Sequence, residues 1–215
     1  MSALLPPAPL VSAFLLASFV LAITPGPGVL YIVTRSLVQG RRCGLVSVAG
    51  VALGNLGNAF AASIGLAALF ALSSLAFAAV KYAGALYLVY LGVQMFRSSP
   101  ADEAAVVPPA VPLRRVFSDG FVVALLNPKT TLFFAAFLPQ FLSPQAAPML
   151  QSMTLGALFV ALAAVTDCAY ALAAGFVAPA LAQARGLRRY GRRLGAGVFI
   201  GLGVFTALSG SRTTP

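Results

Sequence analysis

Residues 21–35 read LAITPGPGVLYIVTR, and this stretch decides how the first apolar segment of the chain is built. It places two prolines and two glycines inside a run that extends from Pro9 to Arg35 without meeting a charged residue. Proline in a helix interior costs about 3 kcal/mol or more, because it removes a hydrogen bond and clashes with the preceding turn. The stretch therefore predicts a broken helix. In a membrane, such a break is tolerated only where the backbone is buried in protein or lines a cavity.

The composition is that of an integral membrane protein. Of the 215 residues, 60% are hydrophobic and 8% are charged, whereas soluble domains carry about 25% charged residues. We expect an all-α membrane protein with a single transmembrane domain over residues 1–215. Six apolar segments predict six transmembrane helices, of which the first and fourth are broken. They run over about residues 9–34, 44–71, 74–96, 116–142, 149–183 and 193–210.

The net charge of +10 is concentrated in three short segments between the apolar runs. This distribution follows the positive-inside rule for cytoplasmic loops and argues against a nucleic-acid partner. Because the basic segments follow the first, third and fifth spans, we expect both termini outside and the lipid bilayer as the surrounding medium. The basic residues are Arg35, Arg41 and Arg42; Arg97, Arg114 and Arg115; and Arg185, Arg188, Arg189, Arg192 and Arg193.

The sizeable linker at about residues 98–114 divides the chain into two repeats of three spans, at about 9–97 and 115–210. Since three is odd, the second repeat crosses the membrane in the opposite sense to the first. This arithmetic predicts two inverted three-helix repeats, a frequent plan among secondary transporters, whose substrates bind at broken helices near the membrane midplane.

The two repeats share a feature at matching places. TPGPG in the first span and NPK in the fourth both interrupt an apolar run near its middle. Thr24–Pro25 and Asn127–Pro128 each pair a favoured N-cap residue with proline, which suits the first helical position. We therefore expect new half-helices over 25–35 and 128–141.

A helix N-terminus carries unbonded N–H groups and a partial positive charge, so each break can bind a carboxylate. The carbonyls freed upstream, such as those of Leu21 and Ile23, can accept bonds from a cation or an ammonium. A packing kink without binding function is the alternative. The expected substrate-binding residues at the two breaks are Thr24, Pro25, Gly26, Pro27, Gly28, Asn127, Pro128 and Lys129.

Two charged residues inside apolar segments are candidates for function. Asp167 is an acid near the centre of the fifth apolar segment, and such a residue is costly in a membrane and functional by default. It can couple transport to protons or bind a substrate ammonium, with a structural pairing to Lys129 as the alternative. Lys129 is expected to bind a substrate carboxylate, unless it forms a helix-locking salt bridge.

Small and amide residues in the second segment predict close helix packing. Gly50 and Gly54 form a small-xxx-small face, which Gly197 and Gly201 repeat in the sixth segment. Asn55 and Asn58 are expected to bond between helices, and Asn58 is also a candidate substrate contact.

The motifs together resemble the lysine/homoserine exporter (LysE/RhtB) family. The matching stretches include ITPGPGVLYIVTRSLVQGRRCG, KYAGALYLVYLGVQMFRSS, GFVVALLNPKTTLFFAAFLPQF and GVFIGLGV. The resemblance implies a bacterial inner-membrane protein that exports an amino acid or a close derivative, in exchange for protons. Many members have Asn after TPGP, where this chain has Gly28, and His near the position of Asn58. Since the chain has no His, a histidine cannot carry the coupled proton, and more weight falls on Asp167.

Three other functions remain as alternatives. A metal or inorganic-ion exporter needs more buried ligands than one acid. A membrane thiol redox carrier needs paired thiols, and Cys43 and Cys168 do not look paired. A membrane enzyme needs a nucleophile and a base, and no such set is visible. We expect no catalytic residues, no metal site and no cofactor, and a homodimer is left open.

The charge distribution gives a direct test of orientation. Because the basic residues occupy alternate linkers, a reporter enzyme fused after Val107 should behave as cytoplasmic. Alkaline phosphatase, which needs the periplasm, should be inactive there, while a cytoplasmic fluorescent protein should mature. Phosphatase activity at this position would contradict both the orientation and the inverted repeat.

Overall fold

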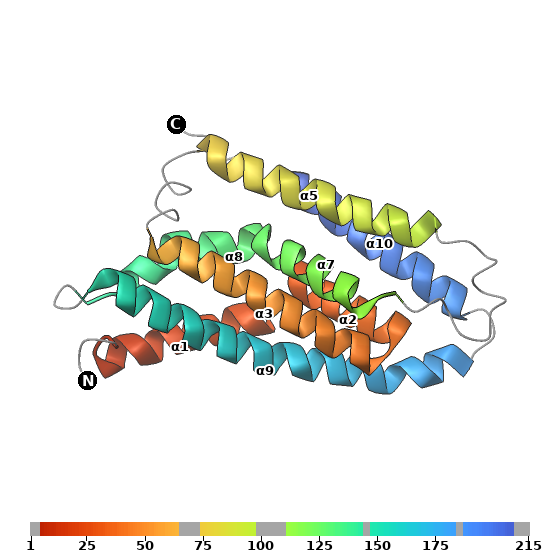
Figure 1. The fold of residues 1–215 in the computed structure, drawn as a ribbon, viewed down its shortest axis with the longest axis horizontal. Helices are drawn as coiled ribbons and strands as arrows, with labels where there is room; N and C mark the ends of the chain where they lie inside the picture. The colour runs from red at the N-terminus through yellow and green to blue at the C-terminus, as the bar shows by residue number, and fades with distance from the viewer. Residues whose placement is uncertain (1–4, 65–73, 98–110, 144–146, 184–186, 209–215) are drawn as a thin grey trace.

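The structure, a computed structural model, describes residues 5–64, 74–97, 111–143, 147–183 and 187–208. Every regular element in these ranges is a helix (Figure 1). The all-α prediction is therefore confirmed for this part of the chain. Most of the expected linker, residues 98–110, lies outside the described residues.

Both expected breaks are present. The first segment is α1 (Ala8–Ile23) followed by α2 (Pro27–Gln39), with a bend of 47° between them. The fourth is α7 (Leu113–Leu125), a bend of 42°, and then a continuation that changes helix type twice. This continuation consists of α8 (Pro128–Leu132), the π-helix η1 (Phe133–Phe137) and the 3₁₀-helix η2 (Leu138–Phe141).

The remaining segments are single helices: α3 (Arg41–Ser63), α5 (Ser74–Arg97), α9 (Pro148–Gln183) and α10 (Leu187–Leu208). Among the described residues, two helices are long and apolar enough to cross a membrane, or up to four if each bent pair is one span. The apolar stretches of α5 and α10, at 82–93 and 196–205, are shorter. The structure therefore gives a helical protein with several candidate spans, and the count of six stays a prediction.

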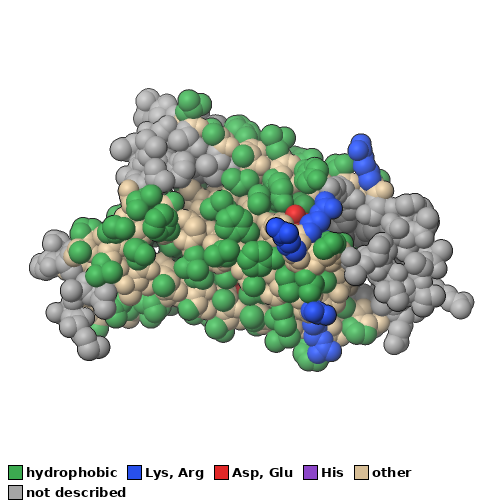
Figure 2. Space-filling model, viewed as in Figure 1, with side chains coloured by type: hydrophobic (Ala, Val, Ile, Leu, Met, Phe, Trp, Pro, Cys, Tyr) green, Lys and Arg blue, Asp and Glu red, His purple; other side chains and the backbone are tan. Residues whose placement is uncertain are grey.

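Arginines from all three expected basic linkers lie in helices instead. Arg41 and Arg42 begin α3, Arg97 ends α5, and Arg114 and Arg115 lie in the first turn of α7. Arg35 belongs to α2, two turns beyond the break, and the group from Arg188 to Arg193 belongs to the first turns of α10. The apolar pattern misplaced these boundaries because the helices extend past the hydrophobic stretch. The Lys and Arg side chains visible in Figure 2 all lie in its right half, whereas α1 begins toward the left of Figure 1.

Helix α3 lies at the centre and packs most extensively against α7 and α9, while α5 and α10 pair along one side (Figure 1). The predicted small-residue face of α3 is confirmed. A Cβ atom on Gly50 would lie 2.2 Å from the carbonyl oxygen of Phe117, and one on Gly54 would lie 2.5 Å from that of Phe121. The backbones of α3 and α7 therefore touch directly.

The matching expectation for α10 is wrong within the described structure. Gly197 and Gly201 are exposed, and a Cβ atom on either would meet nothing within 4 Å. The close approach is made instead by Gly203, where a Cβ would lie 2.7 Å from the carbonyl oxygen of Ala85 on α5. Spacing alone cannot say which side of a helix faces its neighbour.

The buried apolar side chains form two clusters. One joins α1, η1 and α9 and is rich in aromatic rings, including Phe14, Phe133 and Phe159. The other joins α2, α3, α5, α7 and α10 around Tyr31, Val51 and Phe199. The two clusters flank the region in which both helices break.

The contact between α3 and α7 can be tested with one methyl group. Gly50→Ala should lower the thermal stability of the purified protein in detergent, because the new Cβ meets backbone that cannot move aside. Overpacking of this kind costs about 1–3 kcal/mol. Gly197→Ala is the matched control: its Cβ enters open space, and alanine favours helix by about 1 kcal/mol over glycine. Equal melting temperatures for the two variants would contradict the direct backbone contact.

Candidate functional site

The first break is built differently from its prediction. Helix α1 ends at Ile23 with Thr24 as its C-cap, and α2 begins at Pro27 with Gly26 as its N-cap. The expected start at Thr24–Pro25 is therefore wrong by two residues. The Thr24 hydroxyl donates to the carbonyl of Val20 at 2.6 Å, so it closes the end of α1 instead of capping α2.

The second break matches its prediction. Asn127 is the N-cap of α8, and Pro128 takes the first helical position. The Asn127 side-chain oxygen accepts a hydrogen bond from the backbone N–H of Lys129 at 3.0 Å. Its amide nitrogen donates to the Thr130 hydroxyl at 3.1 Å. The N-terminus of α8 is thus capped by the chain itself.

Lys129 joins the two breaks. Its ammonium donates to the backbone carbonyl of Leu21 at 2.7 Å and to that of Thr24. These carbonyls lie at the C-terminal end of α1, where the helix dipole favours a positive charge. The expectation that freed carbonyls hold a cation is confirmed for Leu21, and the cation is the protein's own lysine. The third freed carbonyl, that of Ile23, accepts from the Tyr170 hydroxyl at 2.9 Å.

Gly26 makes room for this lysine. A Cβ atom there would lie 3.1 Å from Cδ of Lys129, which is tighter than nearly all real contacts. Lys129 forms no ion pair with Asp167 within the described structure, whose one recorded salt bridge lies elsewhere. The helix-locking salt bridge considered from the sequence is therefore absent, and the lock is made to backbone instead.

A pocket lies where the two breaks meet. It takes its walls from both ends of the first break, from α3, from the start of α8 and from the middle of α9. The centres of water molecules can occupy about 40 Å³ of it, which is enough for a few waters. Of the expected site residues, those that line it are Gly26, Gly28, Asn127, Lys129 and Asp167. Those that do not are Thr24, Pro25, Pro27, Asn58 and Pro128.

The two helix N-termini at the pocket are not equivalent. Asn127 caps α8, but Gly26 has no side chain with which to cap α2. The first amides of a helix have no partner within it, and Gly28 and Val29 at this end are buried and line the pocket. The N-terminus of α2 is therefore the uncapped helix end at this pocket, the kind of end at which anions bind in proteins.

Asp167 lies on the pocket-facing side of α9, in line with Phe159 and Ala163 at intervals of four residues. Its side chain is only 5% exposed. It takes part in no recorded hydrogen bond or ion pair within the described part of the chain. The carboxyl group is thus buried, unpaired and open to the pocket, as expected for a group that binds or titrates.

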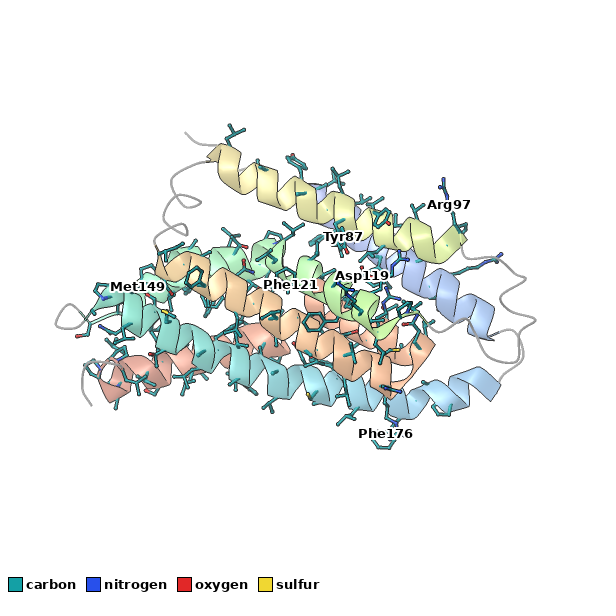
Figure 3. All side chains as sticks on the ribbon, in the orientation of Figure 1. Tyr87, Arg97, Asp119, Phe121, Met149 and Phe176 are labelled. Carbon is teal, nitrogen blue, oxygen red and sulfur yellow. The ribbon has the colours of Figure 1, made fainter. Side chains whose placement is uncertain are left out.

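Sequence reasoning missed a second polar group, which Figure 3 shows on α7 and α5. Asp119 pairs with Arg35 of α2 at 3.0 Å and accepts the Tyr87 hydroxyl at 3.0 Å. Arg35 also donates to the hydroxyl of Tyr31 at 3.2 Å, and that hydroxyl donates to the carbonyl of Val116 at 2.8 Å. The network ties α2, α5 and α7 together two turns from the breaks. Its signal was visible, because Asp119 falls within an apolar segment just as Asp167 does.

The two amides of α3 also differ in role. Asn58 donates from Nδ2 to the carbonyl of Ala124 on α7 at 2.9 Å, so its predicted bonding between helices is confirmed. It does not reach the pocket. Asn55 does line the pocket and makes no such bond, although the sequence predicted one for it as well.

The family model that describes the LysE type translocator matches residues 19–210. The chain belongs to the LysE type translocator family. The match spans both breaks, the pocket and the network around Asp119, so the whole site lies inside the family domain. Its members are transporters, which places the chain among membrane transport proteins. No solved structure matches this translocator.

Several curated relatives are similar to the translocator. The homoserine/homoserine lactone efflux protein of Salmonella typhimurium is 35% identical over 166 residues, which cover 77% of this chain and 81% of the relative. An uncharacterized membrane protein of Vibrio cholerae is 29% identical over 195 residues, or 91% and 95% of the two chains. The leucine efflux protein of Salmonella choleraesuis is 30% identical over 130 residues, or 60% and 61%.

The Arg35–Asp119 pair of the translocator should be costly to break on one side only. Asp119→Ala leaves a largely buried guanidinium without its carboxylate, and such a loss costs about 3–5 kcal/mol. We expect a clear fall in melting temperature in detergent. Replacing both partners, as Arg35→Met with Asp119→Leu, should recover much of the loss, because an apolar pair needs no compensation. A double variant less stable than Asp119→Ala would contradict this.

Proposed function

We propose that this translocator exports an amino acid or a close derivative across the bacterial inner membrane, in exchange for protons. The proposal includes six spans in two inverted repeats, with both termini outside. The names of the relatives, which include homoserine and leucine efflux proteins, support an amino-acid substrate. The matched bends at the two breaks support the repeat.

The observation that carries the proposal is the pair of opposite charges offered by one pocket. The open N-terminus of α2 presents the amides of Gly28 and Val29 to an anion. Asp167 presents an unpaired carboxyl group from α9 to a cation. A zwitterionic amino acid carries both partners on the same carbon atom. Its carboxylate meets the α2 amides, and its ammonium meets Asp167.

The occupied carbonyls favour Asp167 as the ammonium site. Leu21 and Thr24 already accept from Lys129, so in this conformation they are not free for a substrate. Lys129 then contributes its positive charge to the pocket while its ammonium stays bonded to the carbonyls at the end of α1. This assigns Lys129 to a positioning role in place of direct carboxylate binding.

Proton coupling follows if Asp167 holds the ammonium and the proton in turn. The carboxylate binds the substrate on the cytoplasmic side and releases it outside. It then takes a proton from the outer side and returns it to the cytoplasm before the next substrate binds. The Asp167 carboxyl group thus binds the substrate and the proton in turn. This couples their movements in opposite directions without a histidine.

Alternating access requires the pocket to open to one side at a time. The aromatic cluster around Phe14 and Phe133 lies on one side of the pocket, and the network of Arg35 and Asp119 lies on the other. Both join elements from the two proposed repeats. We propose that each opens while the other stays closed.

The function itself is tested by counterflow. Proteoliposomes loaded with one unlabelled amino acid should accumulate the labelled form from outside, across a panel that includes homoserine and leucine. Liposomes prepared without the protein serve as the negative control. Failure of every amino acid in the panel to accumulate would refute the export proposal.

The shared site on Asp167 gives a sharper expectation. Asp167→Asn keeps the shape of the side chain but neither binds a proton nor attracts an ammonium by charge. It should abolish proton-driven export and also slow gradient-free exchange at least tenfold. Asp167→Glu should retain both activities in part. The measurements are export under a pH gradient and counterflow without one.

Each other result has a definite meaning. Gradient-free exchange at the wild-type rate in Asp167→Asn would show that Asp167 carries the proton but does not bind the ammonium. Wild-type export with unchanged pH dependence would remove Asp167 from both roles and leave it as an incidental acid.

A further inference from the structure

Asn55 is a buried amide without a partner at the wall of the pocket. Its side chain is 6% exposed, and its amide oxygen has no hydrogen-bond partner in the described structure. Two other buried side-chain oxygens there are also unpaired, those of Ser18 and Ser36. Neither of these lines the pocket, whereas Asn55 does.

An unpaired buried amide calls for an explanation, because almost all buried polar groups are bonded. A structural hydrogen bond between helices does not explain the presence of Asn55. Asn58, three residues further along α3, shows what a structural amide does on this helix, since it bonds to the backbone of α7. Asn55 makes no bond of that kind, so its amide remains available to a ligand in the pocket.

The position of Asn55 relative to the other binding groups limits what it can hold. Val51 precedes it by one turn of α3 and also lines the pocket. A Cβ on Gly28 would lie 3.3 Å from a methyl group of Val51, so this face of α3 lies against the start of α2. Asn55 therefore lies one turn of α3 further along than the residue that packs against the start of α2.

Asn55 is available to bind the substrate side chain, because the other two polar groups of the substrate have partners elsewhere in the pocket. In the proposed function, on which this inference rests, the carboxylate meets the α2 amides and the ammonium meets Asp167. A carboxamide offers both a donor and an acceptor, whichever way it is turned. A hydroxyl group also offers both, so the two groups are complementary. An aliphatic side chain would bury the amide against carbon and leave it unpaired.

We propose that Asn55 is the specificity-determining residue of the site and binds a hydroxyl group on the substrate side chain. The translocator then prefers a small amino acid with a side-chain hydroxyl to an aliphatic one of equal size. The relatives' names include both a hydroxylated substrate, homoserine, and an aliphatic one, leucine. This preference would distinguish between the two kinds.

The test compares two compounds that differ only in this group. L-homoserine and L-norvaline have side chains of the same length, one ending in a hydroxyl and the other in a methyl. Counterflow rates in proteoliposomes should favour homoserine by about 5- to 150-fold in the wild type, the range expected for one unpaired buried amide. Asn55→Leu, which keeps the size of the side chain, should bring the ratio close to one or reverse it.

Asn58→Leu is the matched control, because it removes an amide from the same helix without touching the pocket. It should reduce the yield of folded protein and leave the homoserine to norvaline ratio unchanged. If Asn55→Leu does not fold, thermal shifts of the wild type decide: homoserine must stabilise it at lower concentrations than norvaline.

The outcomes separate this inference from the function on which it rests. Counterflow of neither compound, nor of any other amino acid, refutes the export proposal and this inference together. Counterflow with equal wild-type rates, with norvaline preferred, or with a ratio that Asn55→Leu leaves intact refutes only the role of Asn55.

Discussion

Everything at the centre of this protein depends on how the backbone groups freed by two helix breaks are satisfied. Lipid offers them no partners, so each must be bonded within the protein or face a cavity. The carbonyls at the end of α1 receive the ammonium of Lys129 and the hydroxyl of Tyr170. The first amide of α8 receives the side chain of Asn127. The amides at the start of α2 receive no cap, and the pocket lies where they are left open.

Because of this asymmetry, the two breaks form one pocket with unlike ends: the carbonyls of the first break are bonded, and the amides at the start of α2 are open. Lys129, from the second break, bonds to the carbonyls at the end of α1. The first break therefore leaves mainly the N-terminus of α2, with its partial positive charge, open to the pocket. Asp167 then adds a buried carboxyl group from a third helix. Two proline-based interruptions thus give different chemistry, because their freed backbone groups are satisfied by different neighbours.

The two sides of the pocket also differ in their chemistry. Aromatic rings from α1, η1 and α9 pack on one side, and a charged network joins α2, α5 and α7 on the other. The broken helix continues beyond α8 as a π-helix, a form that is rare and frequent at functional sites. In it, Phe133 packs against Phe14 and Phe159.

Much of the fold was accessible from sequence, because hydropathy and proline are local properties. All the apolar segments correspond to helices in the described residues, and both breaks occur where proline and glycine predicted them. Asn127–Pro128 was placed correctly because an N-cap followed by proline is a local motif. TPGPG was misplaced because either proline can start a helix. The choice of Pro27 follows from the turn that Thr24 closes and from the passage of Lys129 over Gly26.

The sequence by itself determined that this is a helical membrane protein with two broken helices and an acid inside its fifth apolar segment. Only the tertiary structure decided which groups meet. Asn55 and Asn58 lie about 60° apart around one helix, yet one faces the pocket and the other bonds to α7. Asp119 and Arg35 are 84 residues apart and form a pair that no local pattern announces. The reason is physical: propensity and hydropathy act along the chain, whereas the partner of a polar side chain depends on how its helix is rotated against the others.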